Sequence, residues 1–110
     1  MKSMKLFKQK CINLNSSSIS LKLEEIENLL SEVNSWNLKN NKYIEKKFVF
    51  KNYKKALQFI NLVSEIAERE NHHPDISFGW GYAKISIQTH DLNGLHKNDF
   101  ILASKIDRIS

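Results

Sequence analysis

Four histidines are the residues of this 110-residue chain best suited to chemistry: His72, His73, His90 and His96. Because an imidazole titrates near neutral pH, it can donate or accept a proton under ordinary conditions. Two such groups on opposite sides of a small substrate can protonate a leaving hydroxyl and remove a proton elsewhere, as a dehydration requires. His72, His73 and His90 lie where predicted elements end, and element ends often carry functional sites. We expect these three to form one acid/base site.

Two carboxylates are spaced to support these histidines. Glu68 lies four residues before His72 and shares its face if one helix covers both, whereas Asp99 lies nine residues beyond His90. A carboxylate beside an imidazole can select its tautomer or hydrogen-bond a substrate N–H. Each of these residues also has a purely structural interpretation, because a His-His pair can cap a helix and Asp99 can favour a helix start.

A zinc site is the alternative for the same residues, since histidine and glutamate are common zinc ligands. The spacing matches no HExxH or HxH pattern, and the adjacent His72 and His73 cannot easily both point at one ion. We therefore expect no metal and no cofactor, with the chemistry carried by side chains alone.

Hydrophobic periodicity predicts the elements that must position these groups. The clearest signal is an i, i+3, i+4 stripe from Ala56 to Ala67, in a helix that Pro74 prevents from continuing. In chain order we predict a helix at 21–34, a short strand at Trp36, a turn at 38–42, a strand at 43–50, a helix at 53–70, a strand at 76–78, a turn at 79–81, a strand at 83–90 and a helix at 98–110. The order α-β-β-α-β-β-α predicts a two-layer α+β fold, with helices packed on one face of a four-stranded antiparallel sheet.

Composition describes one ordinary globular domain, with 41% hydrophobic and 26% charged residues. The net charge of +5 raises nucleic-acid binding as an alternative, but the lysines are dispersed and no nucleic-acid-binding signature is present. No stretch approaches the length of a membrane span, and the single Cys11 excludes an internal disulfide. We expect a flexible N-terminal arm at 1–18, a single domain at 19–110, and no nucleic-acid or membrane partner.

Several motifs in register resemble the pterin-4a-carbinolamine dehydratase family. Residues 68–74 read Glu-Arg-Glu-Asn-His-His-Pro and look like the central motif of that family. The elements that follow in the same register are Thr89-His90-Asp91, Gly94-Leu95, Asn98-Asp99-Phe100 and Leu102-Ala103. The resemblance covers about residues 20–109, and the sequence departs from it at Asn71, where many members carry an acidic residue.

The resemblance implies an enzyme, a hydro-lyase that converts 4a-hydroxytetrahydropterin to quinonoid dihydropterin without metal or redox cofactor. That reaction recycles the cofactor of aromatic amino-acid hydroxylases, in the cytoplasm. By resemblance, His72 and His90 would transfer protons, while His73 would position the pterin. The residues expected to bind substrate or orient these groups are Glu68, Asp99, Trp36, Trp80 and Thr89. Which of His72 and His90 is the acid stays open.

A non-enzymatic role is the competing hypothesis. Some members of the family act as dimerisation cofactors of a homeodomain transcription factor, which would place the protein in the nucleus, and a regulatory role in pterin metabolism is a third alternative. Apolar residues left on the outer faces of the helices at 53–70 and 98–110 predict a homodimer or homotetramer.

Overall fold

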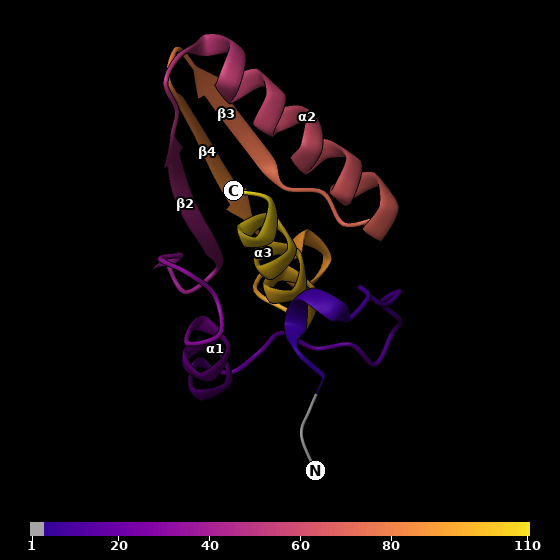
Figure 1. Ribbon diagram of the computed structural model, residues 1–110. Helices are drawn as coiled ribbons and strands as arrows, with labels where there is room; N and C mark the ends of the chain where they lie inside the picture. The colour runs from indigo at the N-terminus through magenta and orange to yellow at the C-terminus, as the bar shows by residue number, and fades with distance from the viewer. Residues whose placement is uncertain (1–3) are drawn as a thin grey trace.

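The computed structural model describes residues 4–110, which form an antiparallel sheet with helices on one face (Figure 1). In chain order the elements are η1 (Leu6–Lys8), α1 (Leu23–Leu30), β1 (Asn37–Lys39), β2 (Tyr43–Val49), α2 (Tyr53–Glu70), β3 (Asp75–Gly79), β4 (Tyr82–Ile87), η2 (His90–Leu92) and α3 (Lys97–Ile109). The four strands are ordered β1-β2-β4-β3, and all neighbours are antiparallel. The predicted α+β architecture is confirmed.

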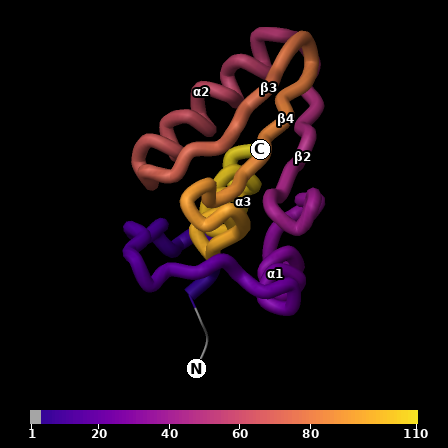
Figure 2. The backbone as a smooth tube through the Cα atoms, turned by 180° about the vertical axis from the view of Figure 1, so that it is seen from behind, coloured from indigo at the N-terminus to yellow at the C-terminus, as the bar shows by residue number. Residues whose placement is uncertain are grey.

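One face of the sheet is apolar because side chains alternate along each strand. Ile44 lies opposite Ile87, and Phe48 opposite Ala83, in the register of β2 with β4. These four side chains are buried, whereas Lys84 between them on β4 is exposed. Helices α2 and α3 cover the apolar face, and the opposite face is open to solvent (Figures 1 and 2).

Helix α2 has the predicted bounds, because both of its ends carry clear local signals. The Asn52 side chain accepts a hydrogen bond from the Lys55 N–H at 2.9 Å and caps the first turn. At the other end, Asn71 adopts the left-handed conformation with φ 52° and stops the helix. Helix α1 is shorter than predicted, since the chain turns after Leu30 and Ser35 has a positive φ of 62°.

The strand predicted to end at His90 instead ends at Ile87. The cause is a tight loop, in which the Thr89 N–H donates to the Gly94 carbonyl at 2.9 Å. His90 therefore begins the short helix η2, and Asn93 closes that helix with a φ of 50°. This loop holds His90 at the surface, beyond the end of the sheet.

The segment predicted as an arm lies at the periphery of the domain, and part of it packs against α3. Leu6 is buried, and the Phe7 carbonyl accepts a hydrogen bond from Lys105 Nζ at 2.9 Å. The Arg108 guanidinium lies over the Phe7 ring, 4.2 Å from its centroid. Both views show this segment passing below α3 (Figures 1 and 2). Residues 1–3 of the predicted arm lie outside the described residues.

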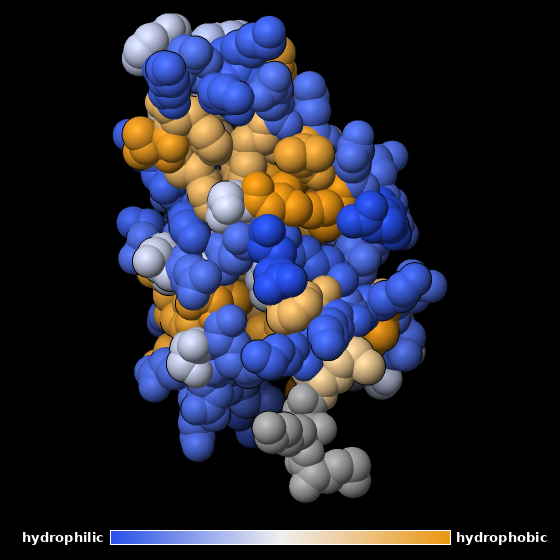
Figure 3. All heavy atoms as spheres, viewed as in Figure 1, coloured by the Kyte–Doolittle hydropathy of each residue, from blue (hydrophilic) through white to orange (hydrophobic). Residues whose placement is uncertain are grey.

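The surface seen from the side of Figure 1 is mostly hydrophilic (Figure 3). An apolar area interrupts it where α2 lies beside β3, and Ala67, Pro74 and Ile76 line a hollow between these two elements. Among residues 4–110, no helix is long and apolar enough to cross a bilayer.

Candidate active site

The end of α2 directs His72 away from the helix. The left-handed conformation of Asn71 turns the chain, and the His72 N–H then bonds the Ala67 carbonyl at 3.2 Å. Asparagine adopts this conformation more readily than most residues, so it can end a helix where glycine is the usual choice. His72 thereby leaves the line of α2 and reaches the first turn of α3.

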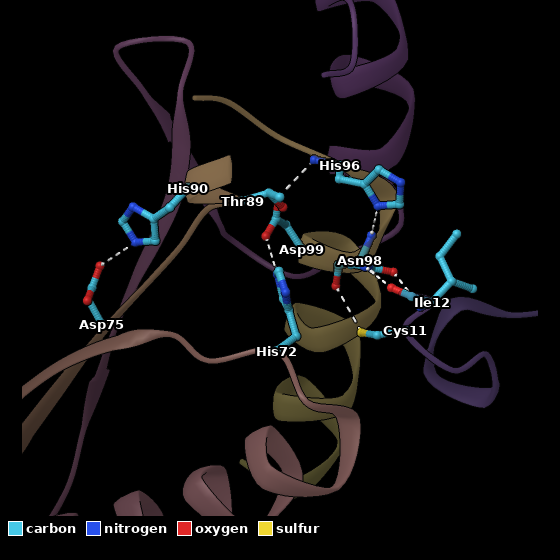
Figure 4. A network of polar contacts seen from close by, with 9 residues as sticks. All are labelled: Cys11, Ile12, His72, Asp75, Thr89, His90, His96, Asn98 and Asp99. Carbon is cyan, nitrogen blue, oxygen red and sulfur yellow. Dashed lines mark hydrogen bonds and ion pairs between the residues drawn. The ribbon is translucent and has the colours of Figure 1, made fainter. Parts of the chain in front are cut away.

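Asp99 is the buried anchor of the site, with none of its side chain exposed (Figure 4). Its Oδ1 lies 2.5 Å from His72 Nε2. Its Oδ2 accepts two hydrogen bonds, from the Thr89 hydroxyl at 2.8 Å and from the His96 backbone N–H at 2.8 Å. The carboxylate also sits in the first turn of α3, where the helix dipole favours negative charge. A buried carboxylate with this many donors is fully compensated.

This arrangement selects the tautomer of His72. An ionised carboxylate only accepts hydrogen bonds, so Nε2 of His72 must carry the proton. In the neutral imidazole, Nδ1 is then the nitrogen with a lone pair available to a ligand. The His72 side chain is 13% exposed, so it is held in place yet reachable from solvent.

The other two predicted histidines each pair with a carboxylate of their own. His73 Nε2 contacts Glu68, and His90 Nε2 lies 3.8 Å from Asp75 Oδ2. Both pairs are exposed at the surface; the His90 side chain is 68% exposed. The spacing predicted that Glu68 and His72 share a helix face. Because the chain turns at Asn71, Glu68 contacts His73 instead. Asp75 was not predicted, because nothing in its spacing connects it with His90.

His72, His73 and His90 all line one pocket of about 420 Å³. That volume lies in the range of small-molecule sites. The residues that line it are Ile12, Asn13, Leu14, Asn71, His72, His73, Gln88, Thr89, His90, Asp91 and Asn98. His72 contacts Asp99 behind it, while His90 projects from the far side toward Asp75 (Figure 4). Within residues 4–110, no group of three His, Cys, Asp or Glu side chains is placed to hold a metal ion.

The two tryptophans expected to bind substrate or orient the histidines do not line this pocket in the described chain. Trp36 is buried in the core, where its Nε1 donates to Asp107 Oδ1 at 3.0 Å. Trp80 lies in the turn between β3 and β4 and is 72% exposed. The sequence placed Trp80 in the turn at 79–81, but it did not show that this turn lies away from the histidines.

Two further features were missed, the segment at 12–14 and the cap of α3. Residues 12–14 were assigned to the arm, yet they line the pocket. His96 caps α3, because its Nδ1 accepts the Asn98 N–H at 3.0 Å. Burial lowers the pKa of His96 below its usual value, and the nearby Asp99 opposes that shift. The only sequence signal for this cap is that His96 lies three residues before Asp99. Histidine is not a usual cap, so that signal is weak.

Comparisons with known proteins identify the family of this chain. A family model described as "Pterin 4 alpha carbinolamine dehydratase" matches residues 19–109. A relative from Rubrobacter xylanophilus is 40% identical over 104 residues, covering 94% of this chain and 97% of the relative. A relative from Methylococcus capsulatus is 47% identical over 91 residues, covering 82% and 80%. Both relatives are provisionally assigned as pterin-4-alpha-carbinolamine dehydratases. The chain belongs to the pterin-4a-carbinolamine dehydratase family.

Solved structures share the fold. A crystal structure from Brucella melitensis, described as a transcriptional coactivator/pterin dehydratase, has a TM-score of 0.78 at 25% identity and covers 82% of this chain and 97% of that chain. A pterin dehydratase-like protein described as a RuBisCO assembly factor in the alpha-carboxysome has a TM-score of 0.60 at 23% identity, covering 69% and 89%. The second likeness concerns the fold alone.

Proposed function

We propose that this chain dehydrates a 4a-hydroxytetrahydropterin to the quinonoid dihydropterin by histidine acid/base catalysis, in the recycling of the pterin cofactor of hydroxylases. The observation that carries the proposal is the buried Asp99–His72 pair on a pocket that two further histidines also line. Membership of the dehydratase family supports the choice of substrate.

The reaction is an elimination of water. The bond between C4a and its hydroxyl oxygen breaks, a proton joins that oxygen, and a proton leaves an adjacent ring nitrogen. The electron pair of that N–H bond forms the new carbon–nitrogen double bond. Oxidation states balance without an electron carrier, so positioned acid and base groups supply the chemistry the reaction needs.

His72 is the base in this proposal. The Nε2–H of His72 points at the Asp99 carboxylate, which leaves Nδ1 to accept the proton from the ring nitrogen. The imidazolium formed in this way is stabilised by the buried negative charge beside it. His73 and Glu68, paired at the rim, position the pterin, and Thr89 holds Asp99 through its hydroxyl.

His90 is the acid. It lines the same pocket as His72 but is mostly exposed, so it exchanges protons readily with solvent. A protonated His90 can donate to the departing hydroxyl, and water then restores its proton. The base and acid roles are thus assigned by environment, because His72 is paired with a buried carboxylate and His90 with an exposed one.

The direct test is turnover of a 4a-hydroxytetrahydropterin by the purified protein. His72→Ala and His90→Ala should each lower kcat by a factor of roughly 10²–10⁴, the usual contribution of positioned acid/base catalysis. His96→Ser is the matched control, because the His96 imidazole does not line the pocket and the substitution keeps the backbone N–H that donates to Asp99. Full activity in both His72→Ala and His90→Ala contradicts the proposal.

A further inference from the structure

The N-terminal segment reaches the pocket from outside the sheet and helices that carry the histidines. Ile12, Asn13 and Leu14 line the same pocket as His72 and His90. The Ile12 side chain is 61% exposed, so it lies on the surface of the segment without belonging to the core. A segment in this position can contact a bound ligand, provided that it is held in place.

Asn98 holds this segment through both polar atoms of its side-chain amide (Figure 4). Its Oδ1 accepts the Ile12 N–H at 3.0 Å, and its Nδ2 donates to the Ile12 carbonyl at 2.9 Å. Asn98 is only 3% exposed, and a buried amide with an unmet donor or acceptor is costly. The Ile12 backbone therefore satisfies both polar atoms of the Asn98 side chain, and Asn98 in turn holds the Ile12 backbone against α3.

A second contact one residue earlier fixes the direction of the segment. Glu70, the last residue of α2, accepts the Cys11 N–H on its Oε1 at 2.8 Å. The Glu70 side chain is 5% exposed, and its Oε2 lies 3.7 Å from Lys105 Nζ. Burial, with Glu70 nearby, raises the pKa of the Cys11 thiol to about 12. The backbone at Cys11 is thus packed between α2 and α3.

We propose that residues 12–14 form a wall of the substrate pocket, and that Asn98 and Glu70 are the positioning residues that hold this wall. The inference rests on the proposed function, and its ligand class is a reduced pterin. A wall that is already ordered lowers the entropic cost of binding, so its release weakens binding. The hydrogen bond between His72 and Asp99 involves no residue of the segment, so releasing the segment should leave the chemical step unaffected.

The kinetic test uses the full chain with two substitutions. Asn98→Ala removes both hydrogen bonds to Ile12 and should raise KM about tenfold, the equivalent of one to two neutral hydrogen bonds. Ile12→Ala trims an exposed side chain, so it should fold normally and also raise KM. In both variants kcat should stay within about twofold of the wild type, with an unchanged pH profile, since acid/base groups are not altered.

The binding test is amide hydrogen exchange with a stable 7,8-dihydropterin as the probe. The pterin should slow exchange at residues 12–14, and Asn98→Ala should speed exchange at Cys11 and Ile12 without the pterin. Asn15→Ala is the matched control, because the Asn15 side-chain amide oxygen accepts hydrogen bonds only from the neighbouring Ser17 in the described chain. That variant should leave KM unchanged.

The outcomes separate the inference from the proposed function. Wild-type protein that fails to turn over the 4a-hydroxytetrahydropterin contradicts the proposed function, while the exchange measurement still decides the role of the segment. An unchanged KM in both variants of an active enzyme overturns the inference. The absence of any slowing of exchange at residues 12–14 by the pterin also overturns it.

Discussion

Asp99→Asn isolates the effect of the buried carboxylate on His72 without changing the shape of the side chain. In the native protein, one carboxylate oxygen faces His72 Nε2, and the other accepts bonds from Thr89 and His96. An amide has only one oxygen, so its NH₂ group must take one of these two places. Facing Thr89 and His96, the NH₂ group would meet the His96 backbone N–H, which can only donate. It will therefore face His72.

An NH₂ group that faces His72 reverses the tautomer of that imidazole. Nε2 must then accept, and the proton moves to Nδ1, which can no longer take a proton from the substrate. We expect kcat to fall by a factor of roughly 10²–10⁴, a barrier increase of about 3–5 kcal/mol. KM should change little, because Asp99 lies behind His72 and does not line the pocket.

Two measurements check this reasoning. Steady-state dehydration gives kcat, and the ¹⁵N shifts of the His72 ring give the tautomer directly. Asp75→Asn is the matched control: it makes the same change at an exposed pair, worth at most about 1 kcal/mol, so kcat should fall no more than about fivefold. A fully active Asp99→Asn variant, or an inactive one that keeps the native tautomer, refutes the argument.

Two further predictions concern stability and assembly. A protonated His96 cannot accept the Asn98 N–H, and folding lowers the pKa of His96. The His96 cap therefore stabilises the fold above about pH 6.5, and this stabilisation is lost as the pH falls. His96→Ser caps at every pH, so urea unfolding should show a smaller stability loss from pH 7 to pH 5 than in the wild type; equal losses would contradict this. Exposed Leu57 and Leu62 on α2 predict a homo-oligomer, whereas α3 contributes no exposed large apolar side chain. Light scattering at micromolar concentration should give a multiple of 12.9 kDa, and a monomer mass would contradict it.

Helix α2 and the antiparallel sheet were predictable because their signals are local. The stripe from Ala56 to Ala67 and the proline that follows identify one helix and its end, and alternation identifies the half-buried strand β4. The end of that strand was misplaced by three residues. The hydrogen bond from the Thr89 N–H to the Gly94 carbonyl closes a short local loop, and a hydropathy pattern does not show such a bond.

The sequence by itself predicted a site of three histidines near the end of α2, from their residue types, their spacing and the motif around them. The tertiary structure alone decided which carboxylate serves which imidazole. A single left-handed residue, Asn71, turns the chain so that His72 reaches the buried Asp99, while Glu68 is left to His73. Only the fold could also place Ile12 against Asn98, 86 residues away, because such contacts depend on packing of distant segments and leave no periodic trace.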